Sequence, residues 1–205
     1  MKNETPRPRG RPRAFDRDEV LDRAITTFWA RGYSGASVDD LTGSMGINRP
    51  SLYATFGSKH DLFLEVIDRY ASTFGRLPFS ALKNNWDPRE VVAAFLEASI
   101  RNATSKGRPR GCLIASVATT GAEKDTQVRE KVSRIFADTE RAITDYFRAA
   151  RDDGRLSGEH NPQALARMVI SITHSIATRA RAGASRKQLS VLADDFVAVL
   201  FPTTN

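Results

Sequence analysis

The chain has 205 residues, a single cysteine and a formal net charge of +7, with a pI of about 9.9. One cysteine excludes an intramolecular disulfide, and no apolar stretch reaches the roughly 18 residues of a membrane span. The first residues lack the apolar segment of a secretory signal. These features predict a cytoplasmic protein whose 40% hydrophobic content fills a core of its own.

Much of the positive charge lies at the start of the chain. Residues 1–13 contain five Lys or Arg residues against one Glu, a net charge of +4. Their proline and arginine content predicts a disordered basic arm. Arg9-Gly10-Arg11 is the core of an AT-hook, in which two arginines flank a glycine that lets the backbone sink into the minor groove. We therefore expect Arg9 and Arg11 to contact DNA, and the alternative is a tail that only aids solubility.

The rest of the chain has the apolar spacing of α-helices, and no segment predicts a convincing strand. Capping signals and glycine stops divide it into about nine helices. Their expected ranges are 16–32, 37–46, 48–57, 58–74, 87–101, 112–119, 126–151, 162–181 and 186–201. Three of these helices begin at a capping box, formed by Ser37 with Asp40, Ser58 with Asp61 and Ser185 with Gln188. The sequence thus predicts an all-α fold.

Residues 37–57 have the layout of a helix-turn-helix, with two short helices around a turn that contains Gly46. The second helix of such a motif enters the DNA major groove. Asn48 caps this helix, and Pro50 occupies its first turn, where a missing N–H costs nothing. Arg49 is then placed to reach a guanine edge with two hydrogen bonds, the alternative being a solvated side chain.

Other polar groups around this second helix fit contacts to the DNA backbone. Ser51 is small enough to let the helix approach closely. The Tyr53 hydroxyl can donate to a phosphate, although the residue can equally be a core aromatic. Lys59 adds positive charge at the start of the next helix, where free amides already favour anions.

At this point the sequence resembles a known family. Residues 25–67 resemble the N-terminal domain of the TetR-like (tetracycline-repressor) family of bacterial transcription regulators. The resemblance is carried by an aromatic pair and a set of short motifs, namely Gly32-Tyr33, Ser37-Val38, Leu41, Gly46-Ile47, Leu52-Tyr53, Phe56, Ser58-Lys59 and Leu62. It implies an N-terminal three-helix helix-turn-helix DNA-binding domain and a larger C-terminal helical domain for ligand binding and dimerisation. On this basis we expect the arm at 1–13, the DNA-binding domain at 14–60 and the regulatory domain at 61–205.

The resemblance also implies a function. It points to a nucleoid-associated homodimer without enzymatic activity, usually a repressor that a small-molecule effector releases from a palindromic double-stranded operator. It implies base-edge contacts near Arg49, Pro50 and Ser51. The phosphate contacts that it implies come from Ser37, Tyr53, Thr55 and Lys59. Many relatives have a bulky or basic residue after the tyrosine, where this chain has Ala54, so the contacts at that end of the helix stay open.

The C-terminal half offers two hypotheses about the signal. Aromatic residues of its long helices, Phe95, Phe136 and Tyr146, can enclose an apolar effector, although a solid helical core needs the same residues. Cys112 follows Arg108 and Arg110 at an expected helix start, where positive charge stabilises a thiolate. It is a candidate sensor of oxidants or electrophiles, and the alternative is an inert buried thiol.

Other function classes have less support in the sequence. The three histidines are too scattered for a metal site, and we expect no cofactor. An enzyme would need a Ser/His/Asp set, paired catalytic carboxylates or a phosphate-binding loop, none of which the sequence offers. A DNA-compacting protein of low specificity, using the arm and the basic loop at 106–111, is the remaining alternative.

Overall fold

The computed structural model describes residues 15–84 and 86–202, so the basic arm with Arg9 and Arg11 lies outside the described residues. Within the described part the chain forms nine α-helices and no strand, which confirms the all-α prediction. The α-helices are α1 (Arg17–Gly35), α2 (Val38–Met45), α3 (Arg49–Phe56), α4 (Lys59–Ser72), α5 (Pro88–Ala103), α6 (Thr119–Ala122), α7 (Thr126–Asp152), α8 (Pro162–Arg181) and α9 (Arg186–Leu200). A 3₁₀ helix, η1 (Phe74–Lys83), follows α4, and a π-helix, η2 (Ile114–Ala118), precedes α6.

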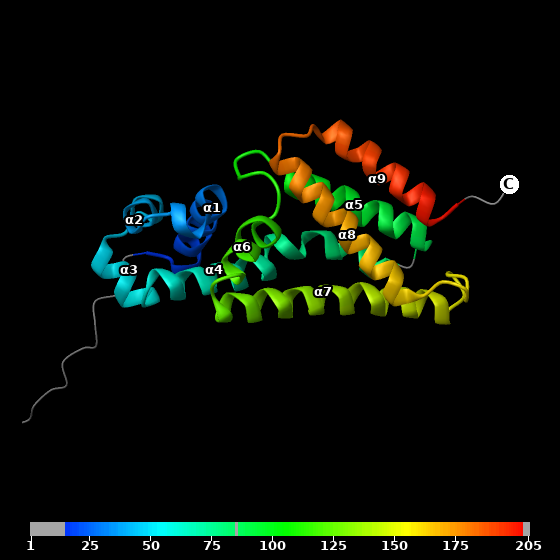
Figure 1. Ribbon diagram of the computed structural model, residues 1–205, viewed down its shortest axis with the longest axis horizontal. Helices are drawn as coiled ribbons and strands as arrows, with labels where there is room; N and C mark the ends of the chain where they lie inside the picture. The colour runs from blue at the N-terminus through cyan, green and yellow to red at the C-terminus, as the bar shows by residue number, and fades with distance from the viewer. Residues whose placement is uncertain (1–14, 85, 203–205) are drawn as a thin grey trace, which may run out of the picture.

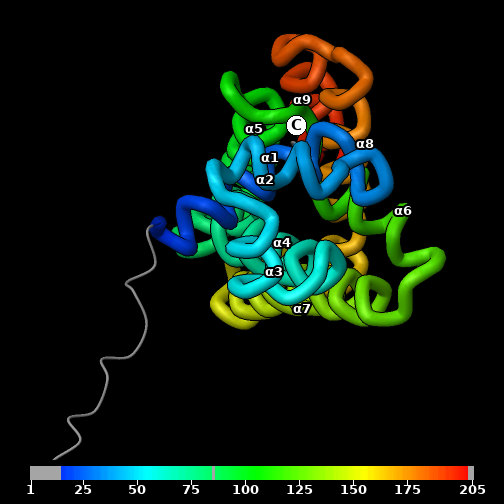
Figure 2. The backbone as a smooth tube through the Cα atoms, turned by 90° about the vertical axis from the view of Figure 1, so that its left-hand side faces the viewer, coloured from blue at the N-terminus to red at the C-terminus, as the bar shows by residue number. Residues whose placement is uncertain are grey.

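The molecule is elongated, with the N-terminal helices at one end (Figure 1). Helices α1, α2 and α3 form this end, and α5, α8 and α9 lie together at the other. The long helix α7 runs beside α4 and reaches the far end under α8. Seen from this N-terminal end, α9 and α7 lie on opposite sides of the molecule (Figure 2). Helix α4 is therefore the direct connection from the helix-turn-helix to the C-terminal half.

Local sequence signals set most helix boundaries. All three predicted capping boxes are present, so those helix starts are confirmed. Asn48 caps α3 by accepting a hydrogen bond from the Ser51 amide at 2.8 Å. Gly46 ends α2 in the left-handed region at φ 70°, which only glycine adopts without strain.

Three segments differ from their predictions. Helix α1 was expected to end at Gly32 but continues to Gly35, with Gly32 in a non-helical conformation at φ 74° inside it. Helix α4 was predicted to reach Phe74 but ends at Ser72, because Gly75 and Pro78 favour the tighter turns of η1. The single helix predicted at 112–119 is a π-helical turn that leads into α6. There the Cys112 carbonyl accepts hydrogen bonds from both the Ser116 hydroxyl and the Ser116 amide, the latter at 3.1 Å.

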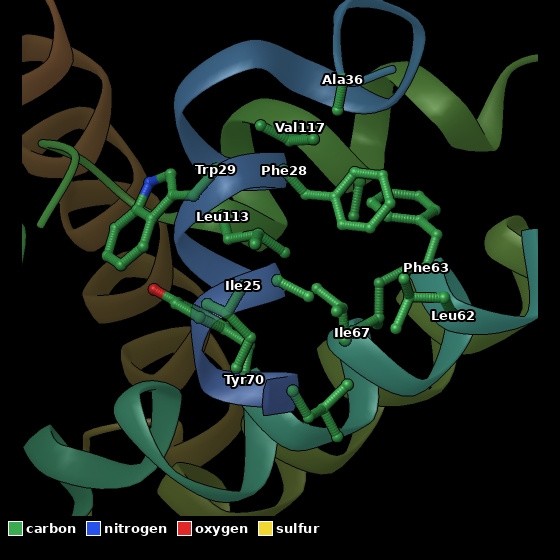
Figure 3. Packing of buried hydrophobic residues seen from close by; sticks show 14 of the residues in the cluster. Ile25, Phe28, Trp29, Ala36, Leu62, Phe63, Ile67, Tyr70, Leu113 and Val117 are labelled. Atoms are coloured by element: carbon green, nitrogen blue, oxygen red, sulfur yellow. The ribbon is translucent and has the colours of Figure 1, made fainter. Parts of the chain in front are cut away.

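Two clusters of buried apolar residues hold the fold together. The first joins α1–α4 to η2 and the start of α7, and the second joins α5, α8 and α9 to the rest of α7. In the first, Phe28 and Trp29 of α1 are fully buried against α4, with Leu113 and Val117 closing the far side (Figure 3). Helix α4 thus packs with the helices before it and with the segment after Cys112.

Candidate DNA-binding surface and effector cavity

Helix α3 presents one apolar face to the domain and one polar face to solvent. Leu52 and Phe56 are buried in the first core cluster. Arg49 and Pro50 are exposed, Tyr53 is 50% exposed, and Ser51 and Thr55 are half-buried. Tyr53 is therefore a surface residue rather than a core aromatic. Tyr53 is the one exposed large hydrophobic residue of α3 in the described part of the chain, and the rest of this face is small or polar, as docking in a groove requires.

Arg49 is held by a residue that the sequence analysis did not select. Its Nε donates to Asp39 Oδ1 at 2.8 Å and its Nη2 to Asp39 Oδ2 at 2.6 Å. Asp39 lies in the first turn of α2, so the pair bridges the two helices of the helix-turn-helix. Arg49 is thus an ordered ion-pair partner rather than a freely solvated side chain. A carboxylate ten residues before the arginine carries no periodic signal in the sequence.

Two of the expected phosphate contacts have structural roles inside the domain. The Ser37 hydroxyl donates to Asp40 at 2.7 Å and accepts from the Asp40 amide at 3.0 Å, so it caps α2. The Lys59 ammonium lies 4.6 Å from the centre of the Tyr33 ring, and burial lowers the pKa of Lys59. A phosphate contact by either residue requires a shared or rearranged side chain.

A charged clamp fixes α4 against α1. The Arg69 guanidinium donates to both oxygens of Asp22 at 2.9 and 3.1 Å and to Asp18 at 2.9 Å. One turn earlier on α4, Glu65 accepts a hydrogen bond from Arg17 at 2.6 Å. Such bidentate pairs fix geometry as well as adding energy. Helix α4 is therefore tied through Glu65 and Arg69 to the start of α1.

A cavity of about 410 Å³ opens at the other end of α4. Three of the predicted pocket residues, Phe95, Cys112 and Phe136, line it, brought together from α5, the segment before η2, and α7. Tyr146 does not line this cavity but packs on Phe147 in the second core cluster, with ring centres 5.4 Å apart. Three of these four residues therefore line one cavity and the fourth does not, because α7 is long enough for its two halves to serve different cores. That the cavity binds an effector stays a prediction.

Several lining residues were missed because they come from segments with no local functional signal. They include Tyr70 at the end of α4, Arg134 of α7 and His174 of α8. The His174 ring lies 5.2 Å from the Phe136 ring, and burial lowers the pKa of His174. An apolar wall with a few polar groups of this kind suits a small organic molecule.

Cys112 lies between this cavity and the α1 core. Burial, with the Cys112 thiol beside it, raises the pKa of the Tyr70 hydroxyl. Arg110 is engaged elsewhere, because its guanidinium donates to the carbonyl of Ala180 in the last turn of α8 at 2.8 Å and to that of Ala184 in the turn before α9. Arg108 covers the Phe74 ring at 4.4 Å. The segment after Cys112 also differs from its prediction, because it is a π-helical turn rather than an α-helix.

The described residues offer neither a metal site nor a membrane-spanning helix. Across 15–84 and 86–202, no group of three or more His, Cys, Asp or Glu side chains is arranged to hold a metal ion. In the same ranges, no helix is long and apolar enough to cross a membrane.

Comparison with known proteins decides the family. Residues 20–66 match the model described as bacterial regulatory proteins of the tetR family, and residues 88–195 match the model of the tetracyclin repressor-like C-terminal domain. The second match alone covers more than half of the chain. The chain belongs to the TetR family.

Relatives of this TetR-family chain are similar over nearly their full length. The HTH-type transcriptional repressor ComR of Escherichia coli is 32% identical over 90% of this chain and 89% of ComR. The HTH-type transcriptional repressor BdcR of Escherichia coli is 29% identical over 90% of this chain and 88% of BdcR. A solved structure of the TetR family regulator CifR, a cysteine mutant bound to 26-base-pair operator DNA, superposes with a TM-score of 0.85 at 36% identity, covering 91% of this chain and 98% of CifR. The TetR-family chain is accordingly a helix-turn-helix transcription regulator, as the resemblance implied.

Proposed function

We propose that the chain is a homodimeric repressor that grips a palindromic DNA operator through α3 and is released when a small organic molecule fills the 410 Å³ cavity. The observation that carries this proposal is the course of α4. Its N-cap, Ser58, follows α3 directly, and its last residues line the cavity. The DNA-binding region is assigned to 14–60, the regulatory region to 61–205, and the site of action to the nucleoid in the cytoplasm.

The proposed dimer forms through the outer faces of α8 and α9. Met168 of α8 is 44% exposed, and Val191 and Val199 of α9 are 52% and 78% exposed. Apolar side chains left open on two neighbouring helices are suited to packing against the same pair in a second copy. Two such subunits have to present their α3 helices about 34–36 Å apart to meet successive major grooves on one face of the DNA.

Release by the effector is a matter of differential affinity. A molecule that fits the cavity better in the dimer geometry that cannot bind DNA shifts the population toward that geometry. A typical coupling of about 1–3 kcal/mol changes operator affinity by roughly 5- to 150-fold. Because α4 lies in both the DNA-binding core and the cavity wall, a displacement of its cavity end alters the position of α3.

The proposal is tested by the double substitution Arg49→Ala, Tyr53→Ala. Each dimer then loses two guanine contacts, worth about 1–3 kcal/mol each, so operator affinity is expected to fall about 30-fold or more. The operator is first selected from fragments of the source genome. Affinity for it is then measured by competition against unrelated DNA at fixed salt, because non-specific binding depends steeply on salt concentration.

The matched control is Arg148→Ala, an exposed arginine of α7 that pairs only with Asp145 among the described residues. It removes one positive charge far from α3 and is expected to leave operator affinity within about twofold. A wild-type protein that is stably monomeric, or a double variant that retains full affinity, contradicts the proposal. Equal wild-type affinity for operator and unrelated DNA supports the compacting protein instead.

A second candidate function concerns the signal, and the position of Cys112 favours it. The thiol lines the effector cavity beside Tyr70, so a molecule entering the cavity meets it directly. We propose that an electrophilic alkene adds to Cys112: a carbon–sulfur bond forms, the carbon–carbon π bond breaks, and the thiol proton ends on the neighbouring carbon. The adduct then occupies cavity space as a bound effector does.

Cys112→Ser is expected to bind operator within about twofold of wild type and to lose release by N-ethylmaleimide, because the substitution removes the nucleophile with little change in volume. Intact mass reports alkylation at one site, since the chain has one cysteine. Operator binding is measured before and after labelling. Labelled wild type that still binds operator, or a serine variant that is released equally, contradicts the sensor.

A further inference from the structure

The ion pair between Arg49 and Asp39 leaves one edge of the arginine available. A guanidinium presents a side edge, made of Nε and Nη2, and an end edge, made of Nη1 and Nη2. Asp39 takes the side edge with two hydrogen bonds, at 2.8 and 2.6 Å. Within the part of the chain that the structure describes, no acceptor takes Nη1. Two parallel N–H groups, one on each terminal nitrogen, therefore point away from Asp39.

The remaining edge has the chemistry of a guanine reader. Guanine offers N7 and O6 as neighbouring acceptors in the major groove, and a bidentate arginine is the commonest specific contact to it. Arg49 is the first residue of α3, the end of a recognition helix that contacts base edges. Its side chain is 59% exposed, so the free edge is open to a ligand.

We propose that Asp39 determines base specificity by acting as a positioning residue for Arg49. The carboxylate holds the guanidinium plane in one orientation on the α2–α3 surface, so that the end edge meets guanine without a search through arginine rotamers. This inference rests on the proposed operator-binding function. Pre-organisation of this kind strengthens the contact with the correct base, and a base that lacks paired acceptors gains nothing from it.

An exposed ion pair has a simpler explanation, which the same residues make testable. Surface pairs of this kind contribute little to stability, and a carboxylate near DNA repels every phosphate regardless of sequence. If Asp39 acts only through its charge, its removal strengthens binding to all DNA by the same factor. If it positions Arg49, its removal reduces discrimination at the base that Arg49 reads. The ratio of affinities separates the two explanations, and a single affinity does not.

The experiment is a selection from operators randomised at each half-site position, using wild type, Arg49→Ala, Asp39→Ala and Asp39→Asn. The position at which Arg49→Ala loses its preference identifies the base pair that Arg49 reads. Wild type is expected to prefer guanine there by about 5- to 150-fold. Asp39→Ala is expected to reduce that preference about three- to tenfold while binding unrelated DNA as well as or better than wild type. Asp39→Asn, which retains one acceptor, is expected to have a guanine preference between those of wild type and Asp39→Ala.

The matched control is Asp145→Ala, which removes a carboxylate from another exposed pair, with Arg148 on α7. It is expected to keep the wild-type preference at every position. Thermal unfolding of both Asp39 variants shows whether α2 remains intact, since an acidic residue in the first turn stabilises a helix slightly.

The outcomes distinguish this inference from the function on which it rests. Wild type without preference at any position overturns the proposed operator binding itself. Wild type with a preference that Arg49→Ala or Asp39→Ala leaves unchanged overturns only the positioning role of Asp39. If Asp39→Ala binds all DNA sequences more tightly by the same factor, the positioning role is also overturned, and Asp39 acts only by repelling phosphates.

Discussion

Trp29→Ala is expected to lower the free energy of unfolding by about 3–5 kcal/mol, the range for removing a large aromatic side chain from a packed core. Trp29 is fully buried and meets Tyr70 edge-on, with ring centres 5.2 Å apart. It is the point at which α1, α4 and the segment around Leu113 come together (Figure 3). The loss therefore falls on the contact between the DNA-binding end and the cavity wall.

Trp86→Ala is the matched control, because Trp86 is 51% exposed and its removal leaves no buried cavity. The Trp86 substitution is expected to lower the free energy of unfolding by less than about 1 kcal/mol. Urea unfolding, followed by far-ultraviolet circular dichroism at fixed protein concentration, measures both variants, since the proposed dimerisation makes stability depend on concentration. A Trp29 variant as stable as the Trp86 variant contradicts the packing described here.

Gly111→Ala is expected to lower the free energy of unfolding by about 2–4 kcal/mol. Gly111 has φ 91°, which a residue with a Cβ adopts only under strain. An added Cβ also lies 2.9 Å from the Ala177 carbonyl oxygen and 3.1 Å from Arg181 Cβ, so the loop before Cys112 has to lift away from α8. Since this loop carries Cys112 into the cavity, the variant is expected to respond less to the effector as well.

The control for this substitution lies in the same loop. Gly107 has φ 80° but nothing within 4 Å of an added Cβ, so Gly107→Ala retains the backbone strain without the collision. It is expected to cost about 1–2 kcal/mol. Thermal unfolding of the two variants, measured at one protein concentration, gives the difference that the collision contributes. Equal losses contradict the close approach of Gly111 to α8.

What the sequence predicted correctly depends on short-range chemistry. A serine oxygen that caps an amide three residues on works through local contacts, and so the helix starts at Ser37, Ser58 and Ser185 could be located from the sequence. The helix-turn-helix could be located in the same way, because Gly46 and Asn48 act on their own neighbours.

The features that were missed depend on packing between distant segments. Periodicity marks Phe136 and Tyr146 as the same kind of residue, and only the placement of α4, η1 and α8 puts one in the cavity wall and the other in a solid core. The same holds for His174 and Tyr70, which reach the cavity from separate helices. Asp39 was missed because its partner lies across a turn, at a spacing that no helical period marks.

The triple contact from Arg69 to Asp18 and Asp22 makes α1 and α4 move together. The 14 residues of α4 span about 21 Å at 1.5 Å per residue. The C-terminal end of α4 lies in the cavity wall, so a tilt of the helix there is amplified at its N-terminal end. A tilt of α4 by about 10° moves its N-terminal end, next to α3, by roughly 4 Å. In the proposed dimer the same tilt of the second subunit doubles the change in the distance between the two α3 helices. Successive major grooves on one face of the DNA lie about 34 Å apart. A change of this size in the distance between the two α3 helices takes one of them out of its groove, while each DNA-binding domain keeps its own structure.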